Sequence, residues 1–486
     1  MSAAAPSAGC TDDPARRPPS DPPVDAGDDG DAPIKCGAGD ALVDGACVPA
    51  GVPAGGCGDG FVSENHGCTP VLPPGACGRG TMAVPGERNC RPVAGCGDPP
   101  WGDIPVDSGT QYVDGSYRGT DSDGSADRPW TTVQAGIIHA ESGGIVAIAE
   151  GIYPESPVSG GKPVALWGRC PELVELQSWE QFEALVLDAD GAEVHTLALT
   201  SKQSFGLFVA GGLGIVVDRV WIHDTADYGF YIAGFLDETE VTVRGSLVER
   251  GTAGLVMTSG KATLEETVVR QGVFDPLLGP GRGVDIGDDP DTGIASQAEI
   301  RRSVIEENME SGVVVYGSEV TITDTVIRNT LPAADGRFGH GLAVQSSAAP
   351  SQVTLNTSVI EGNRSIGLSV VGSTLSMSRS VVSATSPQEL DRKFGDGIFA
   401  LQFGKTELTI SESRIADSAR AGVANFAATM SIGATVLECN AIQLDGEALG
   451  GDYQFEDRGG NACSCGPEAG VCQVVSTNLE PPIAVR

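Results

Sequence analysis

From about residue 220 to residue 440, the hydrophobic pattern repeats one short unit. One copy is EVTITDTVIRN, from Glu319 to Asn329: an apolar–Thr–apolar run, a turn, an aliphatic pair and a second turn. The second aliphatic residue of each pair marks the copies: Ile222, Val248, Val269, Ile305, Ile327, Ile360, Val382, Ile415 and Leu437. The last intervals are 36, 22, 33, 22, 33 and 22 residues. Such self-similarity predicts an array in which each unit buries its apolar face against the next.

A glycine follows each of the first eight aligned positions and opens another alternating segment, such as Val313-Val314-Val315. These glycines are Gly229, Gly254, Gly283, Gly312, Gly341, Gly367, Gly397 and Gly422. Period-two alternation bounded by turn residues indicates half-buried strands. A unit of 22 residues has room for three strands and three turns but not for a crossover helix. We therefore predict an all-β fold, a right-handed parallel β-helix with coils stacked about 4.8 Å apart.

Turns and insertions punctuate this array. Three residues after an aligned position come Asn308, Asn363 and Asn440, where we expect turn residues with left-handed φ. The extra residues of the long units always precede the glycine strand, at Gln271–Arg282, Asn329–His340 and Ala384–Asp396. Two of these insertions resemble each other, DGRFGHGLAV from Asp335 and DRKFGDGIFA from Asp391. The pattern predicts a row of loops on one edge, where binding residues usually gather.

Four regions follow from composition. Residues 1–33 combine a lipoprotein-like start, MSAAAPSAGC, with a Pro/Asp-rich spacer that lacks the apolar content to fold. Residues 34–97 are Cys-rich tandem repeats, 98–438 the β-helix, and 439–486 a Cys-rich cap and tail. We expect lipidation at Cys10. The basic and apolar parts of a signal peptide are missing, so either the start of the chain is misassigned or trimmed, or the match is a chance one.

The cysteines predict disulfides. Three tandem units pair Cys36 with Cys47, Cys57 with Cys68, and Cys77 with Cys90, because each has too little apolar content for a core. Cys96 is left over, and Cys170 is its candidate partner, with the connectivity left open. The last four, Cys439, Cys463, Cys465 and Cys472, make two more bonds of open connectivity. This usage indicates an oxidising compartment, in the extracellular space or outer cell envelope.

The net charge of the chain limits the classes of partner that it can bind. The chain carries 30 basic and 65 acidic residues, a net charge of −35. This excludes nucleic acid and anionic membrane surfaces as natural partners, because like charges repel. A membrane association would therefore run through a lipid anchor.

The segment Pro129-Trp130-Thr131-Thr132-Val133-Gln134-Ala135, with Gly151-Ile152-Tyr153 after it, is similar to the opening of pectin-lyase-like β-helix proteins. The resemblance is to a domain family of unknown function found in secreted bacterial proteins. It implies the right-handed β-helix fold and no agreed activity. Here Thr131 or Thr132 can cap a short helix that covers the open first coil. The segment from Cys439 to Cys472 is the counterpart at the other end.

Two acidic turns have calcium-like spacing. Asp121, Asp123 and Asp127 surround a glycine and can supply oxygen ligands to Ca²⁺, although Asp-Gly-Ser runs are also ordinary turns. A second acidic turn runs from Asp285 to Asp291.

The outward column of the glycine strands offers a binding face. It reads Tyr231, Val256, Asp285, Val314, Ala343, Ser369, Phe399 and Ala424. One carboxylate in a small or apolar stripe weakens a hydrolase interpretation, since glycoside hydrolysis needs two. We expect a binding face of Tyr231, Asp285 and Phe399, walled by loops carrying Arg337, His340 and Lys393. The alternative is that the loops fold over the stripe and bury it.

The sequence thus favours an exported surface protein without catalysis, a binding or structural module whose partner is a polysaccharide or a cell-surface molecule. The alternative is a Ca²⁺-dependent polysaccharide lyase or a glycoside hydrolase. In the lyase version, Asp285 and Asp288 hold Ca²⁺, and Arg337 or Lys393 takes the proton.

Overall fold

The computed structural model describes residues 34–179, 181–468 and 470–484. Cys10 and the spacer lie outside the described residues, so lipidation stays a prediction. Residues 35–486 form one compact unit, which is described below. The boundaries at residues 97 and 438 also stay predictions.

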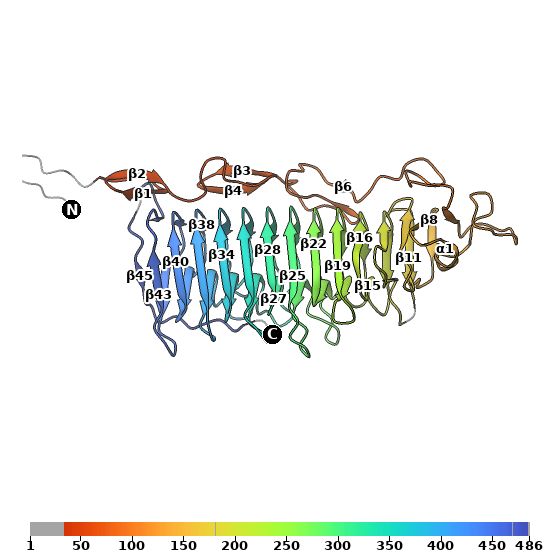
Figure 1. The fold of residues 1–486 in the computed structure, drawn as a ribbon. Helices are drawn as coiled ribbons and strands as arrows, with labels where there is room; N and C mark the ends of the chain where they lie inside the picture. The colour runs from red at the N-terminus through yellow and green to blue at the C-terminus, as the bar shows by residue number, and fades with distance from the viewer. Residues whose placement is uncertain (1–33, 180, 469, 485–486) are drawn as a thin grey trace, which may run out of the picture. The chain divides into compact units, whose positions relative to one another are not determined.

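Three long parallel sheets make up the body of this unit, and from β10 onward each coil contributes one strand to each sheet, as predicted (Figure 1). The 14-stranded sheet contains β7 (Gln111–Val113), β8 (Gly144–Ile148), β10 (Val164–Gly168), β13 (Glu193–His195), β16 (Gly212–Asp218), β19 (Thr239–Arg244), β22 (Gly260–Glu265), β25 (Ser296–Arg301), β28 (Glu319–Thr323), β31 (Gln352–Asn356), β34 (Thr374–Ser378), β37 (Glu407–Ser411), β40 (Thr429–Gly433) and β43 (Gln454–Asp457). The 13-stranded sheet contains β9 (Gly151–Tyr153), β11 (Val174–Ser178), β14 (Ala198–Ser201), β17 (Trp221–His223), β20 (Leu247–Glu249), β23 (Val268–Arg270), β26 (Val304–Glu306), β29 (Val326–Arg328), β32 (Val359–Glu361), β35 (Val381–Ser383), β38 (Arg414–Ala416), β41 (Val436–Glu438) and β44 (Ala462–Ser464). The 12-stranded sheet contains β12 (Leu185–Leu187), β15 (Leu207–Val209), β18 (Phe230–Ala233), β21 (Ala253–Thr258), β24 (Arg282–Gly287), β27 (Ser311–Tyr316), β30 (His340–Gln345), β33 (Ile366–Val371), β36 (Asp396–Leu401), β39 (Ala421–Phe426), β42 (Ile442–Glu447) and β45 (Val474–Val475).

The strand register follows the sequence repeat. In the 13-stranded sheet, Ile305 pairs with Ile327 and Ile327 with Ile360, and the other aligned aliphatic residues pair in the same way. These residues are buried in one continuous apolar core that runs through the coils. Each coil hydrogen-bonds to the next, so the backbone groups between coils are satisfied without a helix.

The three asparagines after the aligned positions have a different role from the one expected. The left-handed residues are their predecessors Glu307, Gly362 and Cys439. The asparagine side chains are buried instead and bridge neighbouring coils. The amide of Asn363, for example, accepts from Thr330 N at 3.0 Å and donates to Ile327 O at 3.2 Å. The prediction of left-handed φ at these positions was wrong, because the buried backbone groups of the turn need a side-chain partner.

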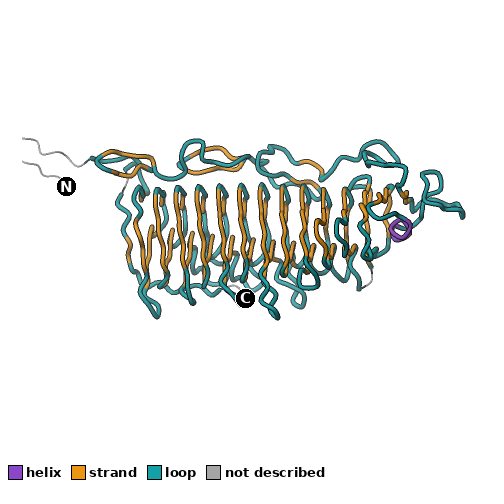
Figure 2. Tube along the Cα trace, viewed as in Figure 1, coloured by secondary structure: helices purple, strands orange, loops and turns teal. Residues whose placement is uncertain are grey.

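The two ends of the core are closed differently. The predicted short helix α1 (Val133–His139) lies at the end of the stack that holds the first coil (Figure 2). It begins after Thr132, whose hydroxyl accepts from Ala135 N at 3.2 Å, and it buries Val133 and Ile137. At the other end, β43, β44 and β45 extend the three sheets, fastened by the Cys439–Cys465 and Cys463–Cys472 disulfides. Among the described residues, no helix is long and apolar enough to cross a bilayer.

The Cys-rich repeats form three hairpins, all packed on the outward face of the 13-stranded sheet (Figure 1). They are β1 (Asp40–Val43) with β2 (Ala46–Pro49), β3 (Phe61–Glu64) with β4 (Gly67–Pro70), and β5 (Thr81–Met82) with β6 (Arg91–Pro92). Each unit holds one predicted disulfide, and Cys96 is bonded to Cys170. The six disulfides indicate an oxidising, extracytoplasmic compartment.

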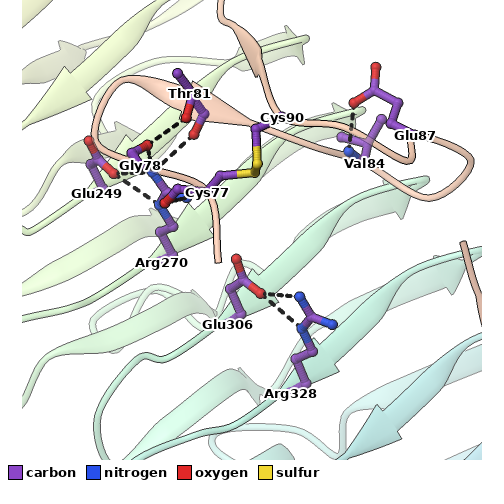
Figure 3. Close-up of a disulfide and its surroundings, with 10 residues drawn as sticks. All are labelled: Cys77, Gly78, Thr81, Val84, Glu87, Cys90, Glu249, Arg270, Glu306 and Arg328. Carbon is purple, nitrogen blue, oxygen red and sulfur yellow. Dashed lines mark hydrogen bonds and ion pairs between the residues drawn. A yellow bond between two sulfur atoms is a disulfide. The ribbon is translucent and has the colours of Figure 1, made fainter. Parts of the chain in front are cut away.

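The hairpins explain why each repeat has an aliphatic pair. In β29, Ile327 faces the core, whereas Val326 faces outward and packs with Met82 and Val84 of the third unit. Val381 packs in the same way with Val52, and Val436 packs with Ala41. Arg270 adds a polar attachment, donating to the carbonyl oxygens of the third unit (Figure 3).

The outward residues of the 14-stranded sheet are mostly Thr, Ser, Gln and Glu and are partly or fully exposed. The 12-stranded sheet carries the predicted outward column, paired in register from Tyr231 to Ala424. The insertions before β24, β30 and β36 all lie at the edge where the chain enters this sheet. The residues of the predicted binding face therefore lie on this sheet and on the loops at its edge.

Candidate functional site

Four aromatic rings form a cluster on the outward side of β15 and β18. Phe205 lies 5.2 Å from Tyr228 in a stacked arrangement, and Phe208 lies 5.5 Å from Tyr231, also stacked. Edge contacts of 5.2 Å between Phe205 and Tyr231 and 5.7 Å between Tyr228 and Tyr231 join the two stacks. All four side chains are partly exposed. We call this cluster the aromatic face.

The aromatic face is built by two consecutive coils with the same local sequence. Phe208 and Tyr231 are opposite each other in the outward column of the 12-stranded sheet. Phe205 and Tyr228 stand three residues earlier, at the turns that lead into β15 and β18. Between them, Gly206 and Gly229 leave no room for a side chain, since a Cβ at Gly206 would lie 2.4 Å from Ile222 Cγ2. The turns therefore lie close to the core, and the rings project from them.

A charged group lies next to the aromatic face. Arg282 donates to Asp285 at 2.8 Å and to the Tyr316 hydroxyl at 3.1 Å, and it is also ion-paired with Glu310. Burial raises the pKa of Tyr228, and the nearby carboxylates Asp227 and Asp285 raise it further. Burial likewise raises the pKa of Tyr316 to about 12. Both phenols are therefore neutral hydrogen-bond donors at physiological pH.

Tyr231 and Asp285, two residues of the predicted binding face, thus lie on the partly exposed upstream part of the column. His340 and Phe399 do not lie on an exposed face. Each is 1 % exposed. Phe338 packs edge-on against His340 at 5.5 Å, and a segment near the C-terminus packs on Phe399. The expected surface is covered here, as in the alternative that the loops bury the stripe.

Arg337 and Lys393 are brought together by the two sister loops. Both line a pocket of about 280 Å³ that also includes Phe338, Phe394 and Glu480. Lys393 Nζ lies 3.0 Å from the Glu480 carboxylate, and Arg337 lies 3.4 Å from Asp335. The loops touch directly, because Leu390 N donates to Gly336 O at 2.8 Å.

The proposed catalytic set is not assembled at this pocket. Asp285 stands on β24, whereas Lys393 precedes β36, four strands further along the sheet, or about 19 Å at one strand spacing per coil. Asp288 is buried and accepts from Ala348 N at 3.1 Å. The arrangement therefore does not bring Asp285 and Lys393 into one reacting centre, and it buries Asp288.

The acidic turns do not gather into a metal-binding cluster. Within the described ranges, no group of three or more His, Cys, Asp or Glu side chains is arranged to hold a metal ion. Asp123 is ion-paired with Arg128 and accepts from Ser125 at 2.6 Å, while Asp121 accepts from the Tyr117 hydroxyl. The Ca²⁺ proposal at Asp121, Asp123 and Asp127 therefore gains no support from this geometry.

The fold is shared with known carbohydrate-active proteins. The family described as "Right handed beta helix region" matches residues 291–445. The chain matches none of the curated proteins. The catalytic unit of a GH87 α-1,3-glucanase from Streptomyces thermodiastaticus strain HF3-3 aligns over 77 % of this chain and 71 % of its own, with 12 % identity and a TM-score of 0.53.

Two other solved structures are similar at lower scores. Pectate lyase Pel9A covers 63 % of this chain and 78 % of its own at 14 % identity, with a TM-score of 0.38. The Dettilon tailspike protein covers 73 % and 70 % at 10 % identity, with a TM-score of 0.49. The right-handed parallel β-helix fold is confirmed by the family match and by the likeness to the glucanase, which at 12 % identity concerns the fold alone.

Sequence reasoning found Tyr231 and missed the rest of the aromatic face. The signal was present: Phe205-Gly-Leu-Phe208 and Tyr228-Gly-Phe-Tyr231 repeat one pattern, aromatic–Gly–apolar–aromatic, in consecutive coils. Aromatic residues are scarce in this chain, at 5 % of all residues. Two copies of that pattern in successive coils place four rings side by side.

Proposed function

We propose that this protein is an exported glycan-binding module that holds a polysaccharide chain against the aromatic face. The observation that carries the proposal is the cluster of four partly exposed rings on neighbouring coils, two stacked pairs joined by edge contacts. A pyranose ring presents an apolar C–H face that packs on an aromatic ring, and its hydroxyl groups remain available at the rim. Exposed aromatic groups of this kind are typical of binding surfaces.

The neighbouring charged group completes the surface. Asp285 and the Tyr316 hydroxyl, both held by Arg282, offer an acceptor and a donor beside the rings, as hydroxyl groups of a sugar require. The likeness in fold to an α-1,3-glucanase supports a glycan as the class of partner in general. Retention at the cell surface through Cys10 stays a part of the proposal.

Binding is favoured over hydrolysis by the arrangement of the carboxylates. A glycosidase uses two carboxyl groups in different roles, one as an acid and the other as a base or nucleophile. Asp285 and Glu310 are instead both engaged by the buried guanidinium of Arg282. We therefore expect retention of the glycan without turnover.

The test is a screen of the full chain against a panel of neutral and acidic polysaccharides, by affinity electrophoresis and calorimetry. Tyr231→Ala and Phe208→Ala are expected to weaken binding at least tenfold, a loss of about 1.4 kcal/mol. Phe235→Ala is the matched control, because Phe235 is exposed on the turn after β18 and is outside the stacked cluster. Cleavage products, or equal binding by all three variants, would overturn the proposal.

A further inference from the structure

The downstream part of the outward column is covered by a segment of the chain itself. Residues 476–484, here called the C-terminal segment, follow β45. Leu479 and Ala484 pack against a cluster that includes Phe399 and Phe426. The two phenylalanine rings lie 5.5 Å apart on β36 and β39. Under the C-terminal segment lies a second pair of aromatic rings, Phe399 of the column and Phe426, which stands two residues after the column residue Ala424.

Side chains of β42 fix the start of this segment. The Glu447 carboxylate accepts from Thr477 N at 2.8 Å, from Leu479 N at 3.0 Å and from the Ser476 hydroxyl at 2.8 Å. Asp445 accepts from the Thr477 hydroxyl at 2.8 Å. The attachment thus depends on a few charged side chains, whereas the coils beneath depend on continuous strand pairing.

The later part of the segment is held at the sister loops. Arg420 Nη1 donates to Glu480 O at 2.9 Å, and Lys393 is ion-paired with the Glu480 carboxylate. Both partners of the Lys393–Glu480 pair are more than half exposed, so solvent competes with the contact and it stabilises little. The 280 Å³ pocket beside Pro481 and Ile483 leaves space next to the segment.

We propose that the C-terminal segment is a displaceable cover, and that a glycan chain long enough to extend from the aromatic face replaces it. The inference rests on the proposed function. Tyr231 and Phe399 belong to one outward column of one sheet and stand six strands apart, about 29 Å along the stack. Between them, Val314 and Ala343 are buried under the partly exposed side chains of Tyr316 and Phe338. A polymer that extends from the aromatic face therefore crosses the outer side of these two rings before it reaches the covered rings. The site is then short when covered and long when open.

Full-chain variants separate the two states. Leu479→Ser removes the apolar attachment of the segment, and Ile483→Ala is the matched control, since the Ile483 side chain is mostly exposed. With oligosaccharides cut from the retained polysaccharide, Leu479→Ser is expected to raise the affinity for long chains about tenfold. Its affinity for short chains, which reach only the aromatic face, is expected to stay unchanged. Equal effects on short and long chains would overturn the inference.

A second measurement needs no glycan. Leu479→Ser is expected to increase binding of an apolar fluorescent dye several-fold and to speed hydrogen exchange at the amides of Thr477 and Leu479. Strand amides of β36 are expected to keep their protection, and Ile483→Ala to behave as wild type. No change in dye binding or exchange would overturn the displaceable cover. A dye response together with no glycan binding at all would overturn the proposed function and leave the cover standing.

Discussion

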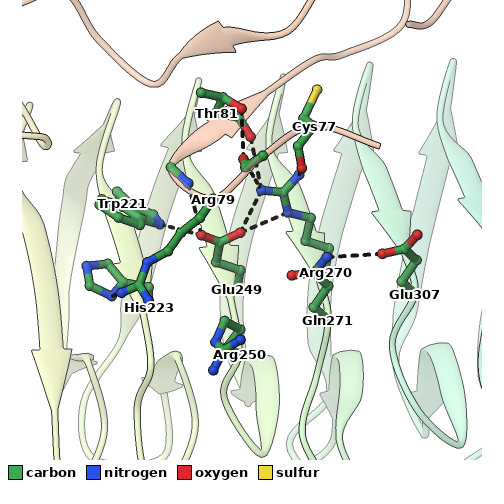
Figure 4. A network of polar contacts seen from close by, with 12 residues as sticks. Cys77, Arg79, Thr81, Trp221, His223, Glu249, Arg250, Arg270, Gln271 and Glu307 are labelled. Atoms are coloured by element: carbon green, nitrogen blue, oxygen red, sulfur yellow. Dashed lines mark hydrogen bonds and ion pairs between the residues drawn. The ribbon is translucent and has the colours of Figure 1, made fainter. Parts of the chain in front are cut away.

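Arg270 and Glu249 form an ion pair in which both side chains are almost completely buried, with 2 % and 1 % of their area exposed. Nε and Nη2 of Arg270 reach the same Glu249 oxygen at 2.9 and 2.6 Å. The other oxygen accepts from Trp221 Nε1 and Gly80 N (Figure 4). Arg270 also donates to three carbonyl oxygens of the third Cys-rich unit. The buried ion pair on the coil and the backbone groups of the hairpin thus satisfy each other's hydrogen-bonding needs.

Arg270→Met is expected to lower the free energy of unfolding by about 3–5 kcal/mol, because it leaves the Glu249 carboxylate buried without its counter-ion. Denaturant unfolding of the variant measures this loss. Arg301→Met serves as the control, since Arg301 and Glu265 are both partly exposed and such a pair contributes about 1 kcal/mol or less. Equal losses in the two variants would contradict the role given to burial.

The Cys77–Cys90 disulfide closes a loop of 13 residues within the third unit. Replacing both cysteines by serine is expected to destabilise the hairpin by about 3 kcal/mol. The coils are expected to keep their structure, because their stability does not depend on disulfides. In the described part of the chain, the coils from β14 to β38 contain no disulfide-bonded cysteine. Hydrogen exchange checks both points: faster exchange in β5 and β6, and unchanged exchange in β27. Uniformly faster exchange would show that the hairpins and coils unfold as one.

His340 gives the folded state an acid-sensitive contribution. Burial, and then the charge of Arg282, lower the pKa of His340 to about 3, and neither ring nitrogen has a hydrogen-bond partner among the described residues. The unfolded chain binds this proton at higher pH, so the contribution is complete above about pH 6.5 and is lost as the pH falls toward 3. At pH 5 the expected loss is about 2 kcal/mol.

His340→Leu is expected to remove this part of the pH dependence, because leucine fills the site without a group to protonate. Unfolding free energies at pH 7 and pH 5 give the slope. His139→Gln, at an exposed position on α1, should leave the slope as in the wild type. A slope unchanged in His340→Leu would assign the acid sensitivity to other groups.

Phe399 and Tyr231 belong to the same outward column but are expected to respond oppositely to truncation. Phe399→Ala removes a buried ring and should cost about 3–5 kcal/mol in unfolding free energy, with unchanged binding of short glycans. Tyr231→Ala should cost much less stability and lose short-glycan binding. Parallel thermal unfolding and calorimetry distinguish the two. Loss of short-glycan binding in a folded Phe399→Ala variant would place the site further downstream.

Gly341→Ala is expected to destabilise the chain by about 1–3 kcal/mol through overpacking. A Cβ at this position would lie 2.5 Å from Gly367 O, 2.6 Å from Ile360 Cγ2 and 2.7 Å from Asn363 Nδ2. Gly287→Ala is the matched control, because a Cβ there meets nothing within 4 Å. Equal unfolding midpoints for the two variants would mean that the coils shift apart at little cost.

The fold was predictable because the sequence of each strand shows the alternation and the repeat that define it. Alternation gives the faces, and the repeat gives the register, as in the pairing of Ile327 with Ile360. The disulfides within the tandem units were predictable from spacing. The segments that cover the outward faces of the sheets were not predictable, because they come from distant parts of the chain. Each aliphatic pair also has an outward residue, such as Val326. These outward apolar residues were the available sign that the 13-stranded sheet is covered.

The candidate site was predicted only in part for the same reason. Tyr231 and Asp285 were found because the repeat shows which side chains point outward. Phe399 points outward too, but its exposure depends on where residues 476–484 lie. Phe205 and Tyr228 were missed because they stand in turns, outside the strand pattern. Asn363 was misread because a left-handed turn and a buried amide bridge favour the same residue type.

The first hairpin brings the beginning of the described chain into contact with its end. Lys35 Nζ donates to the carboxylate of Glu468, which lies 433 residues away in sequence. In the first unit, Gly51 N donates to Ala434 O. During synthesis from the N-terminus, the Cys-rich repeats emerge first, but their docking surface on the last coils emerges hundreds of residues later. Contacts of such long range form late in folding. A docked first hairpin therefore reports that the whole array has been completed, and a truncated chain leaves that hairpin without a place to bind.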